Sequence, residues 1–249
     1  MKTHRFAAVV MGLTACVLSA VAVAAEMEPR TLRAYEAYVA SVRQAFLGDG
    51  PGPAGDDQTG HITRVPGGLV HHWRGATFIP GVTLDDVLAV AQDYDRYAAI
   101  HTPVLESRLL AREGNTFRVF ARMKEGGGMV TAVLDVWSVV TYVRGAGEVR
   151  ALGEARTIRQ LADGDWRRPR YLPPGENSGY LWAANTFTRF MERDGGVRVE
   201  LDTLGLSRRF PKLLGWIIEP IVRRIGLSSA ERTLAEFSAA VSQARPTDK

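Results

Sequence analysis

The sequence predicts an α+β protein in which a curved antiparallel sheet wraps around a long C-terminal helix. Residues 104–206 alternate between apolar and polar side chains, with short turn signals between the segments, which is typical of antiparallel strands. Residues 213–225 form an apolar stripe at helical spacing. One face of such a sheet needs cover, and this stripe is the large apolar element available to provide it.

The composition is that of an ordinary globular protein, with 46% apolar and 23% charged residues among 249. It excludes a polytopic membrane protein, a disulfide scaffold and a basic DNA-coating protein. The formal net charge is +4, and it falls to +2 without the first 25 residues, which hold Lys2 and Arg5 and no acid. We therefore expect no nucleic-acid partner.

Residues 1–25 are predicted to be a secretory signal peptide, so a periplasmic or secreted location is expected. A basic start precedes an uncharged run from Phe6 to Ala25 that ends in small residues. Two alternatives remain open. The run is long enough for an uncleaved anchor, and Leu13–Cys16 resembles a lipobox whose cysteine would carry lipid. Residues 17–25 stay apolar, which favours cleavage near Ala25.

Cys16 is the only cysteine, so the mature chain would have none. This excludes a cysteine nucleophile, a cysteine-ligated zinc site and thiol redox chemistry. His71 and His72 are adjacent on a predicted strand, point to opposite faces and cannot ligate one metal together. One partly buried and one exposed histidine are expected there. We expect no metal site and no cofactor.

The mature chain divides into four predicted segments. Residues 26–47 carry apolar side chains at helical spacing, and residues 48–61 are rich in Gly, Pro and Asp, which is typical of a flexible linker. Residues 62–243 form the folded domain, and residues 244–249 a disordered tail. Strands are expected at 69–79, 104–111, 116–124, 129–144, 148–161, 179–192 and 197–206. A helix begins at the capping-box pattern Thr83–Asp86, and Asp194-Gly195 predicts a tight hairpin.

The C-terminal helix is predicted in two pieces. Pro220 is expected to kink the first piece and Gly226 to cap it. Ser228–Glu231 would then begin the second piece.

This order of elements, with several local motifs, resembles the START-like (SRPBCC) superfamily and its helix-grip fold. The likeness of order covers about residues 65–243, and the motif-level likeness is to uncharacterised secreted bacterial members. The motifs lie at Gly179–Trp182, Arg189, Gly195–Val197, Leu206–Arg208, Pro211, Trp216 and Pro220. The resemblance implies a cavity for an apolar ligand, but it implies no reaction, because the superfamily mixes carriers with enzymes.

Asp135 is the most notable acid because its neighbours in sequence are apolar. On an inward face it would need a charged partner, which Arg118, Arg122, Arg156 or Arg189 could supply. On an outer, wet face it would form an exposed salt bridge of little energetic weight. Alternation leaves both open.

Two further patterns concern the last strands. Trp182, Thr186 and Phe190 would share one face of a strand, with Phe187 and Arg189 on the other. Glu200 and Asp202 alternate with apolar residues and are expected to point outward into solvent.

The favoured function is that of a non-catalytic carrier or sensor of a hydrophobic small molecule or lipid, held between the sheet and the C-terminal helix. The expected ligand-binding residues are Phe117, Val119, Asp135, Trp137, Trp182, Phe187, Arg189, Trp216 and Ile217.

Two other functions remain open. In a cyclase- or dehydratase-like enzyme, Asp135, Arg189 or His101 would handle protons, although the position of His101 is more typical of a helix-terminal cation. A membrane-docking module would use Arg208, Arg209, Lys212 and Trp216.

Overall fold

The computed structural model describes residues 27–48, 59–127, 130–162, 165–173, 181–209 and 215–244. The predicted signal segment and residues 49–58 of the predicted linker lie outside these ranges. The elements are α2 (Pro29–Leu47), β1 (Thr59–Val65), β2 (Gly68–Pro80), α3 (Leu84–Ala91), the 3₁₀ turn η1 (Tyr94–Arg96), α4 (Tyr97–Ile100), β3 (Val104–Glu113), β4 (Thr116–Gly127), β5 (Val130–Gly145), β6 (Glu148–Gln160), β7 (Leu181–Arg193), β8 (Gly196–Arg208) and α5 (Gly215–Ala244).

The strands form one antiparallel sheet in the order β1-β2-β8-β7-β6-β5-β4-β3. Short hairpins connect β3 to β4, β4 to β5, β5 to β6 and β7 to β8, whereas β2 pairs with β8, far away in sequence. The helices α3 and α4 fill the crossover from β2 to β3. This is the predicted helix-grip arrangement, and the α+β fold class is confirmed.

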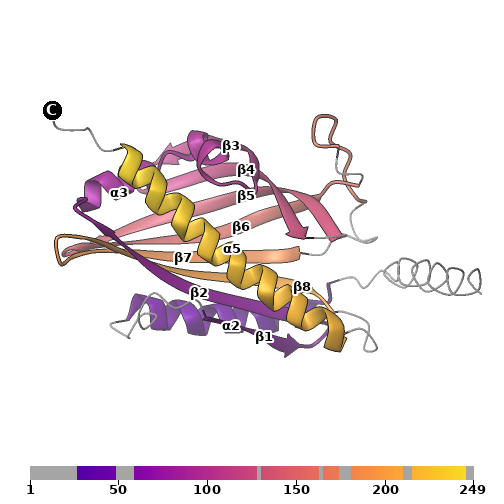
Figure 1. Ribbon diagram of the computed structural model, residues 1–249. Helices are drawn as coiled ribbons and strands as arrows, with labels where there is room; N and C mark the ends of the chain where they lie inside the picture. Colours follow the sequence, from indigo (N-terminus) through magenta and orange to yellow (C-terminus); the bar gives the residue numbers. More distant parts are fainter. Residues whose placement is uncertain are drawn as a thin grey trace, which may run out of the picture.

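Helix α5 crosses the strands of the sheet diagonally (Figure 1). We call the face that it covers the inner face. Its C-terminal half places Leu234, Phe237 and Val241 in the main apolar core, together with α3 and inner-face residues of the strands. Burial of this surface supplies about 25 cal/mol per Å² of apolar area.

Helix α2 packs on the opposite face of the sheet, which we call the outer face. Tyr35 and Phe46 of α2 join a second apolar cluster with Val70, Leu204 and Leu206. The N-terminal helix is therefore part of the packed structure. Because both faces are covered, apolar residues occur at both parities along the central strands.

The C-terminal helix is one continuous element, so the predicted division into two pieces is wrong. Pro220 lies inside α5. Gly226 does not cap a helix. A Cβ atom at this position would lie 2.2 Å from Cε2 of Trp73, so the glycine lets α5 approach the indole of β2 closely.

Local signals at two turns are confirmed. Thr83 and Asp86 form the capping box at the start of α3. Asp194 and Gly195 both have positive φ, 51° and 74°, as the predicted tight hairpin requires. Strand β1 was not predicted, because residues 59–61 fall in the segment interpreted as a linker.

Candidate functional site

Phe117 and Val119 are the two predicted ligand-binding residues that the structure places on the inner face. Both are buried in the main core. The ring of Phe117 packs against Tyr94 and Tyr142, with centroids 5.5 and 5.3 Å away. These two side chains form the closed end of the inner face, under α3.

Asp135 lies on the outer face and is fully buried, so neither predicted environment is correct. Its carboxylate accepts hydrogen bonds from Nε and Nη2 of Arg122, each at 2.7 Å, and from the hydroxyl of Tyr171 at 2.6 Å. Arg122 also donates to the carbonyl oxygen of Trp166 at 2.9 Å. The segment 165–173 thus covers the ion pair.

This ion pair affects the pKa values of the groups around it. The hydrogen bond to Asp135 raises the pKa of the Arg122 guanidinium. Burial, and then the bond to Asp135, raise the pKa of the Tyr171 phenol. The cluster is a structural clamp on the outer face, and it does not face the space beside α5.

The two predicted tryptophans also lie on the outer face. Trp137 packs against Phe120, with ring centroids 5.2 Å apart. Trp182 packs against the cluster under α2, on the same side as Phe187. A bulge between Leu181 and Ala183 shifts the alternation of β7 and explains why Trp182 does not share a face with Thr186.

Phe187 and Arg189 face α2 and not α5, which corrects their predicted role in the cavity. Phe187 stacks on Phe46 with centroids 5.4 Å apart. Arg189 donates from Nη2 to the carbonyl oxygen of Phe46 at 2.6 Å. The neighbouring Arg150 of β6 donates to the carbonyl oxygen of Leu47. Two arginines therefore hold the C-terminal end of α2, where cations are favoured.

Glu200 and Asp202 are buried, which corrects the prediction that both are solvated. Glu200 accepts a hydrogen bond from Nε of Arg198 at 3.1 Å and lies 3.9 Å from Arg189. Asp202 contacts His72 and Arg74, each at 2.7 Å. Helix α2 packs on this outer face and contributes to its burial.

Trp216 and Ile217 belong to the first turns of α5, and their side chains lie outside the described residues. Lys212 lies entirely outside the described residues. Of the other residues in the predicted basic docking stretch, Arg208 is half-buried and Arg209 is exposed.

The inner face changes character around Trp73, which contacts α5 at Gly226. Thr203 pairs with Trp73 on one side and with Thr186 on the other, and Thr186 pairs with Gly153. Directly paired residues of an antiparallel sheet share a face, and Trp73 touches α5. These residues, with others of small size beside them, form what we call the small-residue strip. Its members are Ser138, Gly153, Ala155, Ala184, Thr186 and Thr203, all half-buried.

His71 and Ser207 form the polar end of this face. His71 Nε2 lies 2.5 Å from the hydroxyl of Ser207, and both of these side chains are buried. His72 is buried as well, so the prediction of one partly buried and one exposed histidine is wrong. Burial lowers the pKa of His71 to about 4, so its ring is neutral at physiological pH. The two adjacent histidines do point to opposite faces, as predicted.

The buried charges are distributed unevenly between the two faces. In the part of the chain that the structure describes, every buried charged side chain of the sheet lies on the outer face. These are Arg122, Asp135, Arg189, Glu200 and Asp202. The small-residue strip offers hydroxyl groups, and the neutral imidazole of His71 and the indole of Trp73 lie beside it on the same face, which suits an uncharged or weakly polar molecule.

His101 lies at the C-terminal end of α4, as a helix-terminal residue. Its Nδ1 is 3.6 Å from Glu236 of α5, and its ring packs on Tyr97. Burial lowers the pKa of His101, while Glu236 opposes that shift.

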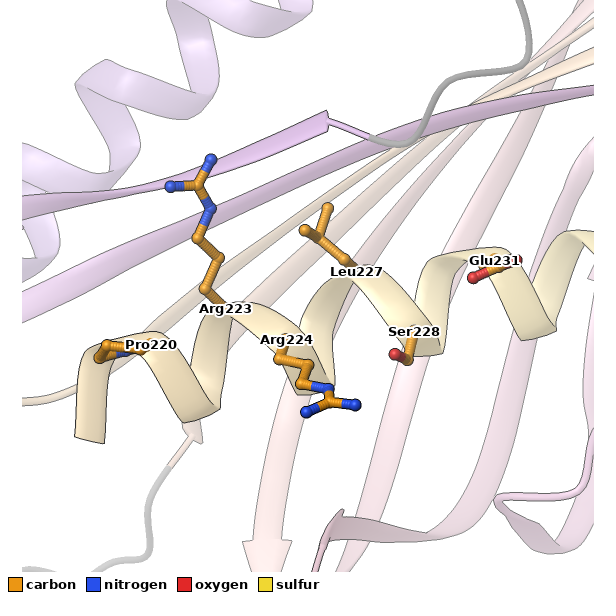
Figure 2. A pocket seen from close by; sticks show the side chains of 6 residues that line it. All are labelled: Pro220, Arg223, Arg224, Leu227, Ser228 and Glu231. Atoms are coloured by element: carbon orange, nitrogen blue, oxygen red, sulfur yellow. The ribbon is translucent and has the colours of Figure 1, made fainter. Parts of the chain in front are cut away.

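A depression of about 320 Å³ lies on the surface of α5 itself, where Arg223, Arg224 and Glu231 project from the helix (Figure 2). Pro220, Leu227 and Ser228 complete its lining. Because one helix supplies the whole lining, this depression is separate from the small-residue strip.

None of the described helices has both the length and the apolar character needed to cross a bilayer.

Sequence reasoning missed the small-residue strip because it ranked candidates by size and aromaticity. Thr186 and Thr203 alternate with large residues that prove to face α2. The signal that identifies them is the register of the sheet, in which Thr203 pairs with Trp73 and Thr186 pairs with Thr203, and this register depends on the pairing of β2 with the distant strand β8.

Comparison with solved structures finds the same fold. Protein TTHA0849 of Thermus thermophilus aligns with a TM-score of 0.50 at 15% identity, over 70% of this chain and 98% of that chain. Zhui aromatase/cyclase from Streptomyces sp. R1128 aligns with a TM-score of 0.49 at 12% identity, over 72% of this chain and 98% of that chain. A STAR-related lipid transfer protein from Xanthomonas axonopodis aligns with a TM-score of 0.47 at 15% identity, over 72% of this chain and 98% of that chain.

No protein-family profile matches the sequence, and no curated protein matches it significantly. The structural likeness, at 15% identity or less, therefore concerns the fold alone. At that level the predicted helix-grip fold is confirmed.

Proposed function

We propose that this protein is an exported carrier or sensor that binds a hydrophobic small molecule or lipid between the inner face of the sheet and the N-terminal half of α5. The small-residue strip is the observation that carries this proposal. Its residues lie on the face of the sheet that α5 crosses and are nevertheless only half-buried, whereas the other end of the same face is filled by Phe117, Tyr142 and Phe237.

The chemistry of the strip supports an apolar ligand with a small polar group. Thr186 and Thr203 present methyl and hydroxyl groups, and His71 with Ser207 supplies a neutral hydrogen-bonding pair at one end. The strip has no charged side chain, so an apolar ligand that covers it does not have to remove a charge from water. The START-like fold agrees with this ligand class, although fold alone does not select a function.

The position of two residues argues against the alternative that the protein is an enzyme. Asp135 and Arg189 face outward and are engaged with Arg122 and with α2, respectively. Proton transfer requires a group within hydrogen-bond reach of the substrate, and these two side chains lie on the wrong side of the sheet for a molecule beside α5.

The test is a measurement of binding with a matched pair of variants. Thr186→Leu adds bulk to the small-residue strip, whereas Thr157→Leu makes the same change at an exposed position of β6 on the outer face. Native mass spectrometry of protein purified from its own envelope identifies any bound lipid, and displacement of a fluorescent fatty acid measures affinity.

We expect Thr186→Leu to weaken binding of the probe by about tenfold or more, the equivalent of about 1.4 kcal/mol, and Thr157→Leu to bind like the wild type. Equal binding by both variants would place the ligand elsewhere. A folded wild-type protein that neither retains an apolar ligand nor binds the probe would refute the proposal. Chemical conversion of the recovered ligand on incubation would favour the enzyme.

A further inference from the structure

A cluster of polar rings lies on the outer face, where α2 meets the edge of the sheet. The hydroxyl of Tyr38 in α2 is 2.7 Å from Nε2 of His61 in β1 and 3.0 Å from Nδ1 of His72 in β2. The phenol oxygen and the two imidazole nitrogens are three potential metal-ligating atoms, and they come from three separate elements.

We propose that Tyr38, His61 and His72 form a binding site for a divalent first-row transition ion. Imidazole nitrogens suit Zn²⁺, Cu²⁺ and Ni²⁺, and Cu²⁺ is generally bound most tightly of these ions. No three His, Cys, Asp or Glu side chains are grouped for a metal within the described ranges. The phenol oxygen supplies the third ligand here.

The surroundings of His72 are those of a metal ligand. Its second ring nitrogen, Nε2, lies 2.7 Å from a carboxylate oxygen of Asp202, and both side chains are buried. Asp202 is itself held by Nε of Arg74 at 2.7 Å. A carboxylate that accepts the Nε2 proton leaves the lone pair of Nδ1 facing Tyr38, and metal-binding histidines are typically oriented in this way.

Binding changes the protons of the cluster in a defined manner. Without a metal, consistent donation runs from His61 Nε2 to the Tyr38 oxygen, from the Tyr38 hydroxyl to His72 Nδ1, and from His72 Nε2 to Asp202. When the ion binds, the phenol proton passes to solvent and the proton of His61 moves to its Nδ1. The phenolate and two nitrogens are then free to coordinate.

The site can accommodate an ion with a small adjustment. Tetrahedral ligands 2.0–2.1 Å from zinc are roughly 3.3 Å apart, so the separations of 2.7 and 3.0 Å between the phenol oxygen and the two nitrogens must widen by about 0.3–0.6 Å. His61 is exposed and lies on β1, an edge strand, which leaves it room to move and leaves solvent to complete the coordination. The ion would join α2 to the sheet.

The experiment titrates the full-length, tag-free protein with Cu²⁺ and, separately, with Zn²⁺, using calorimetry and native mass spectrometry. His61→Ala is the main variant, because its exposed side chain can be removed without opening a core. Tyr38→Phe removes only the ligating oxygen. His101→Ala is the matched control, since it removes a histidine far from the cluster along the chain.

We expect one ion per wild-type chain, with a phenolate-to-copper charge-transfer band and a Tm raised by the metal. His61→Ala should abolish this binding, Tyr38→Phe should remove the band, and Asp202→Asn should weaken affinity by about 10–100-fold. His101→Ala should leave all of these unchanged. Binding by His61→Ala as tight as that of the wild type, or no stoichiometric binding of either ion, would overturn the proposal. Neither result bears on the inner-face ligand.

Discussion

At the scale of single residues, the most consequential feature is that charged side chains are buried on the outer face in matched sets. Asp135 has no exposed surface and is held by two charge-assisted hydrogen bonds from Arg122. Such a pair is expensive to break, because removal of one partner leaves an uncompensated charge away from water.

We predict that Asp135→Asn lowers the free energy of unfolding by about 3–5 kcal/mol, measured by chemical denaturation. The control is Glu113→Gln, which breaks an exposed ion pair with Arg118 and should cost less than about 1 kcal/mol. Replacing both partners with Asp135→Leu and Arg122→Met should recover much of the loss. Similar destabilisation by the Asn and Gln variants would show that the buried pair has no special weight.

His101 should make stability depend on pH. Burial lowers its pKa in the folded state, against the opposing influence of Glu236, so the unfolded chain binds the proton more readily. The resulting penalty is absent above the unfolded pKa of about 6.5 and grows as the pH falls through that value. We predict that the Tm of the wild type falls more between about pH 8 and pH 5 than that of His101→Gln. Parallel curves would contradict this.

At the scale of elements, the sequence predicts strands and helices better than it predicts faces. Seven of the eight strands and the capping box of α3 follow from alternation and turn signals, because these are local properties. The orientation of Asp135, Phe187 and Arg189 does not follow, because α2 and segment 165–173 bury the outer face that a single-covered sheet would expose. The small-residue strip does not follow from the sequence either, because it depends on the pairing of strands that are far apart in the chain.

Helix α2 depends on Arg189, which bonds to the last turn of the helix. A hydrogen bond to a charged group contributes about 1.5–3 kcal/mol, so we predict that Arg189→Ala reduces stability by that amount. In this variant, amide hydrogen exchange should become faster than in the wild type for residues 29–47, and it should change less for β5. Arg193→Ala, at an exposed position of the same strand, is the control. Unchanged protection of α2 would contradict the anchoring role.

Helix α5 depends on Gly226 for its approach to Trp73. In an exposed helix interior, Gly→Ala stabilises a protein by up to about 1 kcal/mol. Here the added Cβ would meet the indole at 2.2 Å, so we predict that Gly226→Ala lowers the Tm. Trp73→Leu lowers it too, by removing a buried ring, but the double variant should be less destabilised than the two losses added together. A higher Tm for Gly226→Ala alone would show that α5 can move away.

At the scale of the whole molecule, the sheet separates the site that we propose for an apolar ligand from the site that we propose for a metal ion. The inner side holds the small-residue strip and a neutral polar pair, and the outer side holds the buried charges and the Tyr38–His61–His72 cluster. We therefore predict that the two proposed binding activities are separable by mutation. Substitution of the strip should leave the outer cluster unaffected, since the sheet lies between them.

The fate of the N-terminal segment determines whether the protein diffuses freely or stays attached to the membrane. We predict that export removes residues 1–25, since the apolar run ends in small residues at Ala25 and helix α2 begins only at Pro29. An uncleaved segment would leave three residues between the membrane span and α2, a reach of about 10 Å, and would hold the outer face close to the bilayer. Intact-mass measurement after expression in a bacterial host tests this. A mass that begins at Glu26 agrees with a freely diffusing carrier, whereas a retained N-terminus or a lipid on Cys16 would indicate a tethered one.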